Sequence, residues 1–171
     1  KCQNSIVVFR IWIPNEQLGF TASDDPNAKA QHYWNLISPH LNDLGTQNID
    51  WLEGPNELDG ILNWYSDYNN AIWFANFWSN LADIMNDNGY HPLVASIAVG
   101  NPALNNEIAQ GVKSTMCPLA DVMKSKSYPI AWGYHGYTKD LTKDVNTELW
   151  LSLRYRWIRD QCGLQGFKII I

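Results

Sequence analysis

The sequence has no cluster of lysine and arginine residues, and its 17 acidic side chains outnumber the 12 basic ones. The resulting net charge of −5 gives little support to binding of nucleic acids or anionic membranes, which both attract basic patches. No apolar run reaches the roughly 18 residues that a transmembrane helix needs. We therefore expect a protein that binds neither nucleic acid nor a membrane.

Cysteine is also scarce. Cys2, Cys117 and Cys162 lie far apart and form no C-x-x-C pair, so neither a zinc motif nor a redox motif is present. Three cysteines allow at most one disulfide within the chain, and the sequence does not show which two of them would form it. A disulfide-dense scaffold is excluded, whereas a secreted enzyme with one bridge remains open.

Nucleotide-binding fingerprints are missing as well, because no G-x-G-x-x-G follows an apolar run and no P-loop occurs. What remains is a globular composition, with 46% hydrophobic and 17% charged residues. The chain is rich in aromatic residues, with 9 Trp and 8 Tyr. Such side chains fill cores and also line sugar-binding clefts, and composition alone favours core packing.

Short apolar runs alternate with amphipathic segments along the whole chain, which predicts strands separated by helices. The strands are expected at residues 6–13, 49–53, 92–99, 130–134 and 167–171, and the helices at residues 26–44, 68–88, 105–124 and 146–162. Asp25 and Pro26 fit the N-cap and first turn of the first helix, and Gly45 is expected to close it. Pro118 is expected to break the third helix.

This alternation predicts a parallel α/β sheet with right-handed crossovers. A doubly wound sheet and a (β/α)8 barrel both fit the order of elements. Polar side chains collect directly after the strands, and in a barrel the carboxyl ends of all strands share one functional face. We therefore predict an incomplete (β/α)8 TIM barrel of about five strands.

Both ends of the sequence interrupt this pattern. The chain enters a predicted strand almost at once, without an initiator Met or signal peptide, and stops inside the apolar run of residues 166–171. We expect residues 1–171 to be the central part of one catalytic domain, truncated at both ends. The rest of the barrel would come from the same parent chain, and the isolated piece is expected to be inactive.

The segment at residues 51–57, WLEGPNE, places Asn56 and Glu57 just after a predicted strand and a Gly-Pro turn. Asn56 offers a donor and an acceptor to a ligand rich in hydroxyl groups. Residues 49–57 resemble the Asn-Glu signature at the end of strand four in clan A retaining glycoside hydrolases, the (β/α)8 cellulase, xylanase and mannanase type. The resemblance implies that Glu57 is the general acid/base and that Asn56 binds the sugar 2-hydroxyl.

Two further matches support the resemblance. His135 and Tyr137 resemble the His-x-Tyr pattern after strand six, which implies that they position the nucleophile and line the cleavage subsite. Arg10 resembles an arginine at the end of strand three, so the visible strands would be three to seven. Trp12 and Trp132 lie on predicted strands and are candidates for stacking on a sugar.

One part of the family pattern is missing from the sequence. A retaining enzyme needs a second carboxylate, the nucleophile, roughly 5–5.5 Å from the acid/base. The resemblance implies a glutamate at the end of strand seven, just beyond Ile171, because Glu16, Glu107 and Glu148 do not fall at that position. Two carboxylates suffice for this chemistry, so no metal or organic cofactor is expected.

Other interpretations remain open. Glu57 could instead be a carboxylate favoured by a helix N-terminus, Glu53 could pair with Arg10 as part of the scaffold, and His135 could be a core histidine. The prediction is an extracellular glycosidase that cleaves a polysaccharide of unspecified type. The alternatives are a non-catalytic carbohydrate-binding or structural barrel, or an aldolase or isomerase, for which Lys168 is poorly placed.

Overall fold

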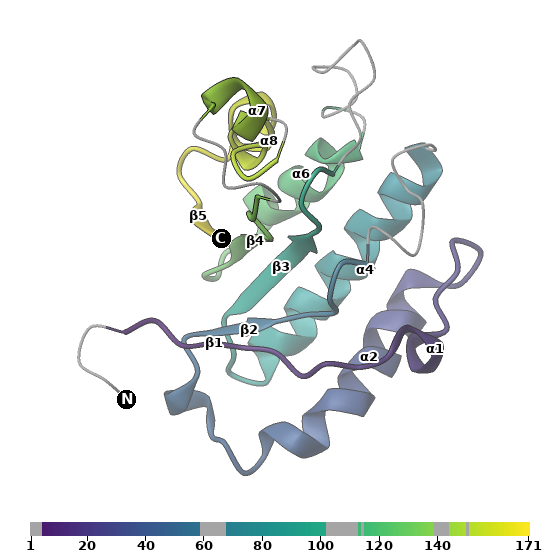
Figure 1. The fold of residues 1–171 in the computed structure, drawn as a ribbon. Helices are drawn as coiled ribbons and strands as arrows, with labels where there is room; N and C mark the ends of the chain where they lie inside the picture. The colour runs from purple at the N-terminus through teal and green to yellow at the C-terminus, as the bar shows by residue number, and fades with distance from the viewer. Residues whose placement is uncertain (1–4, 59–67, 102–112, 114, 139–143, 150) are drawn as a thin grey trace.

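The computed structural model describes residues 5–58, 68–101, 113, 115–138, 144–149 and 151–171. Its centre is a sheet of five parallel strands in the order β1-β2-β3-β4-β5 (Figure 1). The strands are β1 (Val8–Phe9), β2 (Trp51–Glu53), β3 (Pro92–Ile97), β4 (Ala131–Tyr134) and β5 (Lys168–Ile170). The strand order never reverses, and because a doubly wound sheet contains such a reversal, that alternative is excluded.

The prediction of a (β/α)8 TIM barrel is corrected by this topology. Each strand pairs with the next one along the chain, and within the described residues no pairing joins β5 back to β1. The chain therefore forms an open, five-stranded parallel α/β sheet, which is compatible with part of a barrel but in which no TIM barrel is identified. The order of elements predicts parallel neighbours, but it carries no information on whether the outermost strands meet.

Three helices lie next to one another over one face of the sheet (Figure 1), namely α2 (Pro26–Leu41), α4 (Tyr68–Asp87) and α6 (Cys117–Ser125). Right-handed crossovers between successive neighbouring strands place their helices on the same side. The main hydrophobic core lies between these helices and the sheet. Its largest fully buried side chains include Tyr33, Phe74, Phe77, Trp78, Trp132 and Tyr134.

The ends of the first long helix were predicted only in part. Asp25 is the N-cap of α2 as expected, since its side chain accepts a hydrogen bond from the Asn27 backbone N–H, and Pro26 occupies the first turn. The helix nevertheless ends at Leu41, so Gly45 does not close it. Gly45 has φ +70° and precedes the short 3-10 helix η1 (Thr46–Asn48).

The later elements are shorter than predicted. Pro118 lies in the first turn of α6, where a missing N–H breaks no helical bond, and most of the predicted helix before it lies outside the described residues. The predicted helix at residues 146–162 is divided into α7 (Val145–Leu149) and α8 (Tyr155–Cys162). Gly163, in the left-handed region at φ +72°, ends α8 as predicted. The remaining short helix is α1 (Asn15–Leu18).

A disulfide joins Cys117, at the start of α6, to Cys162, at the end of α8. The Cα atoms are 4.9 Å apart and the residues are separated by 45 positions. Lys124 on α6 also donates a hydrogen bond of 3.0 Å to the carbonyl oxygen of Cys162. The two outer helices are therefore linked covalently as well as by packing.

Removing this disulfide with the double variant Cys117→Ala/Cys162→Ala is expected to lower the free energy of unfolding by about 2–4 kcal/mol, because the unfolded chain regains the entropy of an open loop. Urea denaturation of the variant and of the wild type, each with and without reductant, measures the difference. Reductant should destabilise only the wild type. A variant as stable as the oxidised wild type would contradict the bridge.

Gly54 occupies a position where the backbone of the WLEGPNE turn touches the core. A Cβ atom added there would lie 2.2 Å from Cζ3 of Trp78, a side chain that is fully buried in α4. The Gly54 N–H also donates a hydrogen bond of 3.3 Å to the Leu93 carbonyl of β3. A glycine is therefore required at this position by the space beside the indole ring rather than by its own φ angle.

The substitution Gly54→Ala is expected to destabilise the protein by about 1–3 kcal/mol, because the added methyl group overpacks the contact with Trp78. The matched control is Gly166→Ala, since no atom lies within 4 Å of a Cβ built there. Urea denaturation of both variants tests the contact. Equal stability of the two variants would show that the turn does not depend on it.

Candidate active site

Four charged or titratable side chains meet at the carboxyl ends of the strands, the edge at which parallel sheets generally bind ligands. Arg10 follows β1, Glu53 is the last residue of β2, Glu57 lies in the turn after β2, and His135 directly follows β4. We refer to these four side chains as the charged cluster. Arg10, Glu57 and His135 are residues that the sequence predicts for the site, and the structure brings them together.

Three contacts, each a hydrogen bond between oppositely charged groups when His135 is protonated, connect the charged cluster. The Arg10 guanidinium Nη1 lies 3.2 Å from Glu53 Oε1, and the same oxygen lies 3.2 Å from His135 Nε2. The other ring nitrogen, Nδ1, lies 2.8 Å from Glu57 Oε1. Glu53 is the more buried carboxylate, with 11% of its side chain exposed, whereas Glu57 is 32% exposed. The imidazole therefore stands between one enclosed carboxylate and one that solvent can reach.

The protonation state of His135 follows from this arrangement. A neutral imidazole carries a single N–H, so donation to both carboxylates requires the imidazolium form. The hydrogen bond to Glu53 raises the pKa of His135, burial opposes the rise, and the bond to Glu57 adds to it. Arg10 Nη1 also lies 3.4 Å from His135 Nε2, but in this state both atoms are donors and the contact carries no hydrogen bond.

Glu53 is held as a carboxylate. Burial disfavours its charge, but the hydrogen bond from His135 and the positive charge of Arg10 outweigh burial, and the Ser96 hydroxyl contributes in the same direction. The pKa of Glu53 is therefore lower than usual. The structure shows the pairing of Glu53 with Arg10 that the sequence leaves open.

The backbone around the charged cluster is strained. Glu57 and Ser96 have φ angles of 47° and 46°, and Ala95 has a φ of 80°, values that residues other than glycine seldom adopt. The Glu57 N–H donates a hydrogen bond of 3.2 Å to the Ser96 carbonyl, which joins two strained residues directly. The pairing of β3 with β4 also shifts register between Val94 and Ile97. Such conformations cost about 1–3 kcal/mol each and concentrate at functional sites.

A cavity of about 280 Å³ lies beside the charged cluster and is lined by Arg10, Glu53 and His135. The rest of its lining is largely apolar and includes Ile170 of β5 and Ile171, which follows that strand. Glu57 does not line the cavity, but its carboxylate is bonded to His135, which does. The cavity lining thus combines charged and apolar side chains.

The other predicted site residues differ in their surroundings. Asn56 is partly buried beside Glu57, and its side chain makes no hydrogen bond to another described residue. Trp12 and Tyr137 are 66% and 57% exposed, and within the described part of the chain no hydrogen bond or ring contact ties them to the charged cluster. Trp132 is 1% exposed and packs in the main core, a position that favours a packing role over stacking on a ligand.

Sequence reasoning did not predict the contributions of Ser96 and Gly133. A Cβ added to Gly133 would lie 3.3 Å from the Ser96 backbone nitrogen, so β4 approaches the strained part of β3 closely. Ser96 is the single polar residue inside the apolar run of residues 92–99, and nothing in its neighbours signals a left-handed backbone. The glycine in the fourth apolar run was the only sign of this close approach.

No protein family, curated protein or solved structure matches the chain. Among the residues that the structure describes, no group of three or more His, Cys, Asp or Glu side chains is arranged to hold a metal ion. No helix in the same described ranges is long and apolar enough to cross a membrane. Support for any function therefore comes from the charged cluster and its surroundings.

The charged cluster makes stability depend on pH. The raised pKa of His135 stabilises the fold below about pH 6.5, and this contribution is lost as the pH rises through the folded-state value. The lowered pKa of Glu53 stabilises the fold above about pH 4.5, and this contribution is lost as the pH falls. His135→Gln is therefore expected to destabilise by about 1 kcal/mol more at pH 5.5 than at pH 8.5.

Urea denaturation at the two pH values measures this difference. The control is the same substitution in a Glu53→Gln background, where the principal partner of the imidazolium is uncharged and the pH dependence should shrink. If His135→Gln costs the same at both pH values, the imidazolium bridge is disproved.

Proposed function

We propose that the chain contributes the acid/base residue of a glycoside hydrolase that cleaves a polysaccharide, with Glu57 in that role. The observation that carries the proposal is the hydrogen bond of 2.8 Å between the partly exposed Glu57 carboxylate and His135. Glu53 and Arg10 fix the imidazole from its other side. A carboxylate that is both accessible and held in one orientation suits transfer of a proton to a bound ligand.

The chemistry requires Glu57 to change its protonation state twice. A glycosidic oxygen leaves readily only after it receives a proton, and Glu57 in its acid form supplies that proton. The resulting carboxylate then accepts a proton from water in the second step. The imidazolium of His135 stabilises the negative charge that Glu57 carries between the two steps, because its Nδ1–H donates to the carboxylate oxygen.

A retaining mechanism also needs a nucleophilic carboxylate roughly 5–5.5 Å from the acid/base. Glu53 is poorly suited, since Arg10 and His135 already occupy its Oε1 atom and only 11% of its side chain is exposed. We assign the nucleophile to a glutamate that follows Ile171 in the parent protein. The support is positional, because β5 pairs with β4 and Ile171 lines the same cavity as His135.

The remaining assignments concern the substrate. Asn56 lies beside Glu57 with an amide that is available to a sugar hydroxyl, and Arg10 lines the cavity. Trp12 and Tyr137 expose aromatic rings of the kind that stack on sugars. The mechanism needs no metal or organic cofactor.

The Cys117–Cys162 disulfide supports a secreted protein, because such bonds persist mainly in oxidising compartments.

A non-catalytic carbohydrate-binding module is the second candidate. The observation in its favour is that Glu53, the carboxylate nearest to Glu57 through His135, is committed to Arg10. A single accessible carboxylate can orient a sugar without cleaving it. Both candidates predict that the protein binds a polysaccharide, but only the glycoside hydrolase cleaves it.

The test is Glu57→Gln in the full-length parent protein, assayed on glucan, xylan and mannan. The expected result is a fall in kcat of about 10²–10⁴-fold on the polysaccharide that the wild type cleaves, because the leaving oxygen is no longer protonated. With an aryl glycoside that has an acidic leaving group, the first step of the variant should slow less, since the leaving oxygen needs little protonation.

The matched control is Glu16→Gln, an exposed glutamate on α1 outside the charged cluster, which should keep wild-type activity. Circular dichroism establishes that both variants are folded. Undiminished turnover by Glu57→Gln would refute the acid/base role. A wild type that binds these polysaccharides but cleaves none would support the binding module instead.

A further inference from the structure

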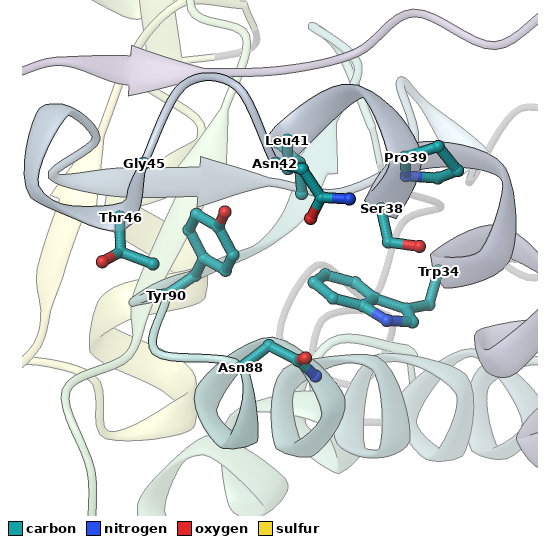
Figure 2. Close-up of a pocket in the computed structure, with 9 residues that line it drawn as sticks. All are labelled: Trp34, Ser38, Pro39, Leu41, Asn42, Gly45, Thr46, Asn88 and Tyr90. Carbon is teal, nitrogen blue, oxygen red and sulfur yellow. The ribbon is translucent and has the colours of Figure 1, made fainter.

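A second cavity, of about 510 Å³, lies at the opposite edge of the sheet from the charged cluster. It is open to solvent and is bordered by the C-terminal ends of α2 and α4 and by the loops that lead into β2 and β3 (Figure 2). Its polar and aromatic lining consists of Trp34, Ser38, Asn42, Thr46, Asn88 and Tyr90. We call it the amino-edge cavity, because it lies where the strands begin.

Two glycines with positive φ angles shape the loops that border this cavity. Gly45 has φ +70° and Gly89 has φ +82°, and each turns the chain between a helix and the following strand. A Cβ on Gly89 would lie 3.4 Å from Cγ2 of Thr46, so the two loops are in van der Waals contact. The Tyr90 N–H donates a hydrogen bond of 3.0 Å to the Met85 carbonyl, which anchors the second loop to α4.

The aromatic part of the wall is also fixed. The rings of Trp34 and Tyr90 lie 6.2 Å apart between centroids, tilted by 60°. Both residues are more than nine-tenths buried, so their positions are set by packing against the core. Figure 2 shows the two rings on opposite sides of the open space, with Asn42 above it and Asn88 below.

The lining is rich in hydrogen-bonding groups, and among the described residues that form it there is no acidic side chain, lysine, arginine or histidine. Burial raises the pKa of Tyr90, which keeps its phenol neutral and able to donate. The side-chain polar groups of Ser38, Asn42, Thr46 and Tyr90 form no hydrogen bond with other described residues. Asn88 uses Nδ2 to bond the Ile84 carbonyl at 2.8 Å, which leaves its oxygen to accept.

We propose that the amino-edge cavity is a binding site for a neutral sugar, one pyranose ring or a disaccharide unit. Hydroxyl groups of such a ligand can replace water on the hydroxyl and amide groups of the lining, of which Asn42, Thr46 and Asn88 are exposed. The described lining carries no charge that would attract an anion or a cation. The volume lies within the roughly 300–1,000 Å³ that small-molecule sites occupy. The site is separate from Glu57 and does not depend on the proposed catalysis.

The experiment uses the isotopically labelled chain, titrated by NMR with the methyl glycosides of glucose, xylose and mannose and with the corresponding β-1,4-linked disaccharides. At least one sugar should shift the backbone amide signals of Gly45, Thr46 and Gly89 in a saturable way. The variants Tyr90→Phe and Asn42→Ala should each weaken that binding about fivefold, as expected for the loss of one neutral hydrogen bond.

The matched control is Asn76→Ala, which removes an exposed asparagine of α4 that does not line the cavity and should leave the affinity unchanged. Glu57→Gln should also leave it unchanged, whether or not the parent protein hydrolyses polysaccharides. The proposal is overturned if none of the sugars gives saturable shifts at these amides. It is equally overturned if the shifts occur only around His135, or if they persist at full affinity in Tyr90→Phe and Asn42→Ala.

Discussion

The arrangement at the carboxyl edge of the sheet depends on one charged group, the imidazolium of His135, which lies between two carboxylates from the β2 segment. The strands that carry these groups, β2 and β4, are not neighbours, because β3 runs between them. Side chains therefore reach across β3, where the register shift and the left-handed Ala95 and Ser96 distort the edge. An unpaired charge on Glu53, whose side chain is only 11% exposed, would be costly, and Arg10 and His135 supply the positive charges that compensate it.

Sequence periodicity predicted which segments form helices and strands better than it predicted the residues at which they begin and end. The five strands and their parallel order followed from alternation, and Asp25 and Gly163 marked helix ends correctly because their local chemistry decides the cap. The prediction of an incomplete (β/α)8 TIM barrel was wrong, because the strands form an open five-stranded parallel sheet in which no TIM barrel is identified. Gly45 was misassigned because a left-handed glycine suits several kinds of turn. The meeting of Arg10 and Glu53 could be anticipated from strand ends, whereas the left-handed Ser96 had no signal in the sequence.

The two edges of the sheet offer opposite chemistry to a ligand. The carboxyl edge concentrates charge and backbone strain in a cavity of about 280 Å³, which suits proton transfer. The amino edge provides a larger, uncharged cavity of about 510 Å³ with hydroxyl and amide groups, which suits recognition without reaction. Helices α2 and α4 pack against each other, and their C-terminal ends border the amino-edge cavity.

The contact between Gly54 and Trp78 has a consequence for how this sequence can diverge. The missing side chain on one residue and the large ring on the other form a single steric unit, although 24 positions separate them. A lineage that replaced the indole with a smaller ring would relax the demand for glycine, and a lineage that lost the glycine first would have to change the ring. The residues at positions 54 and 78 should therefore covary among descendants. The sequence of the turn that carries Glu57 is then constrained by the size of the side chain at position 78 of helix α4.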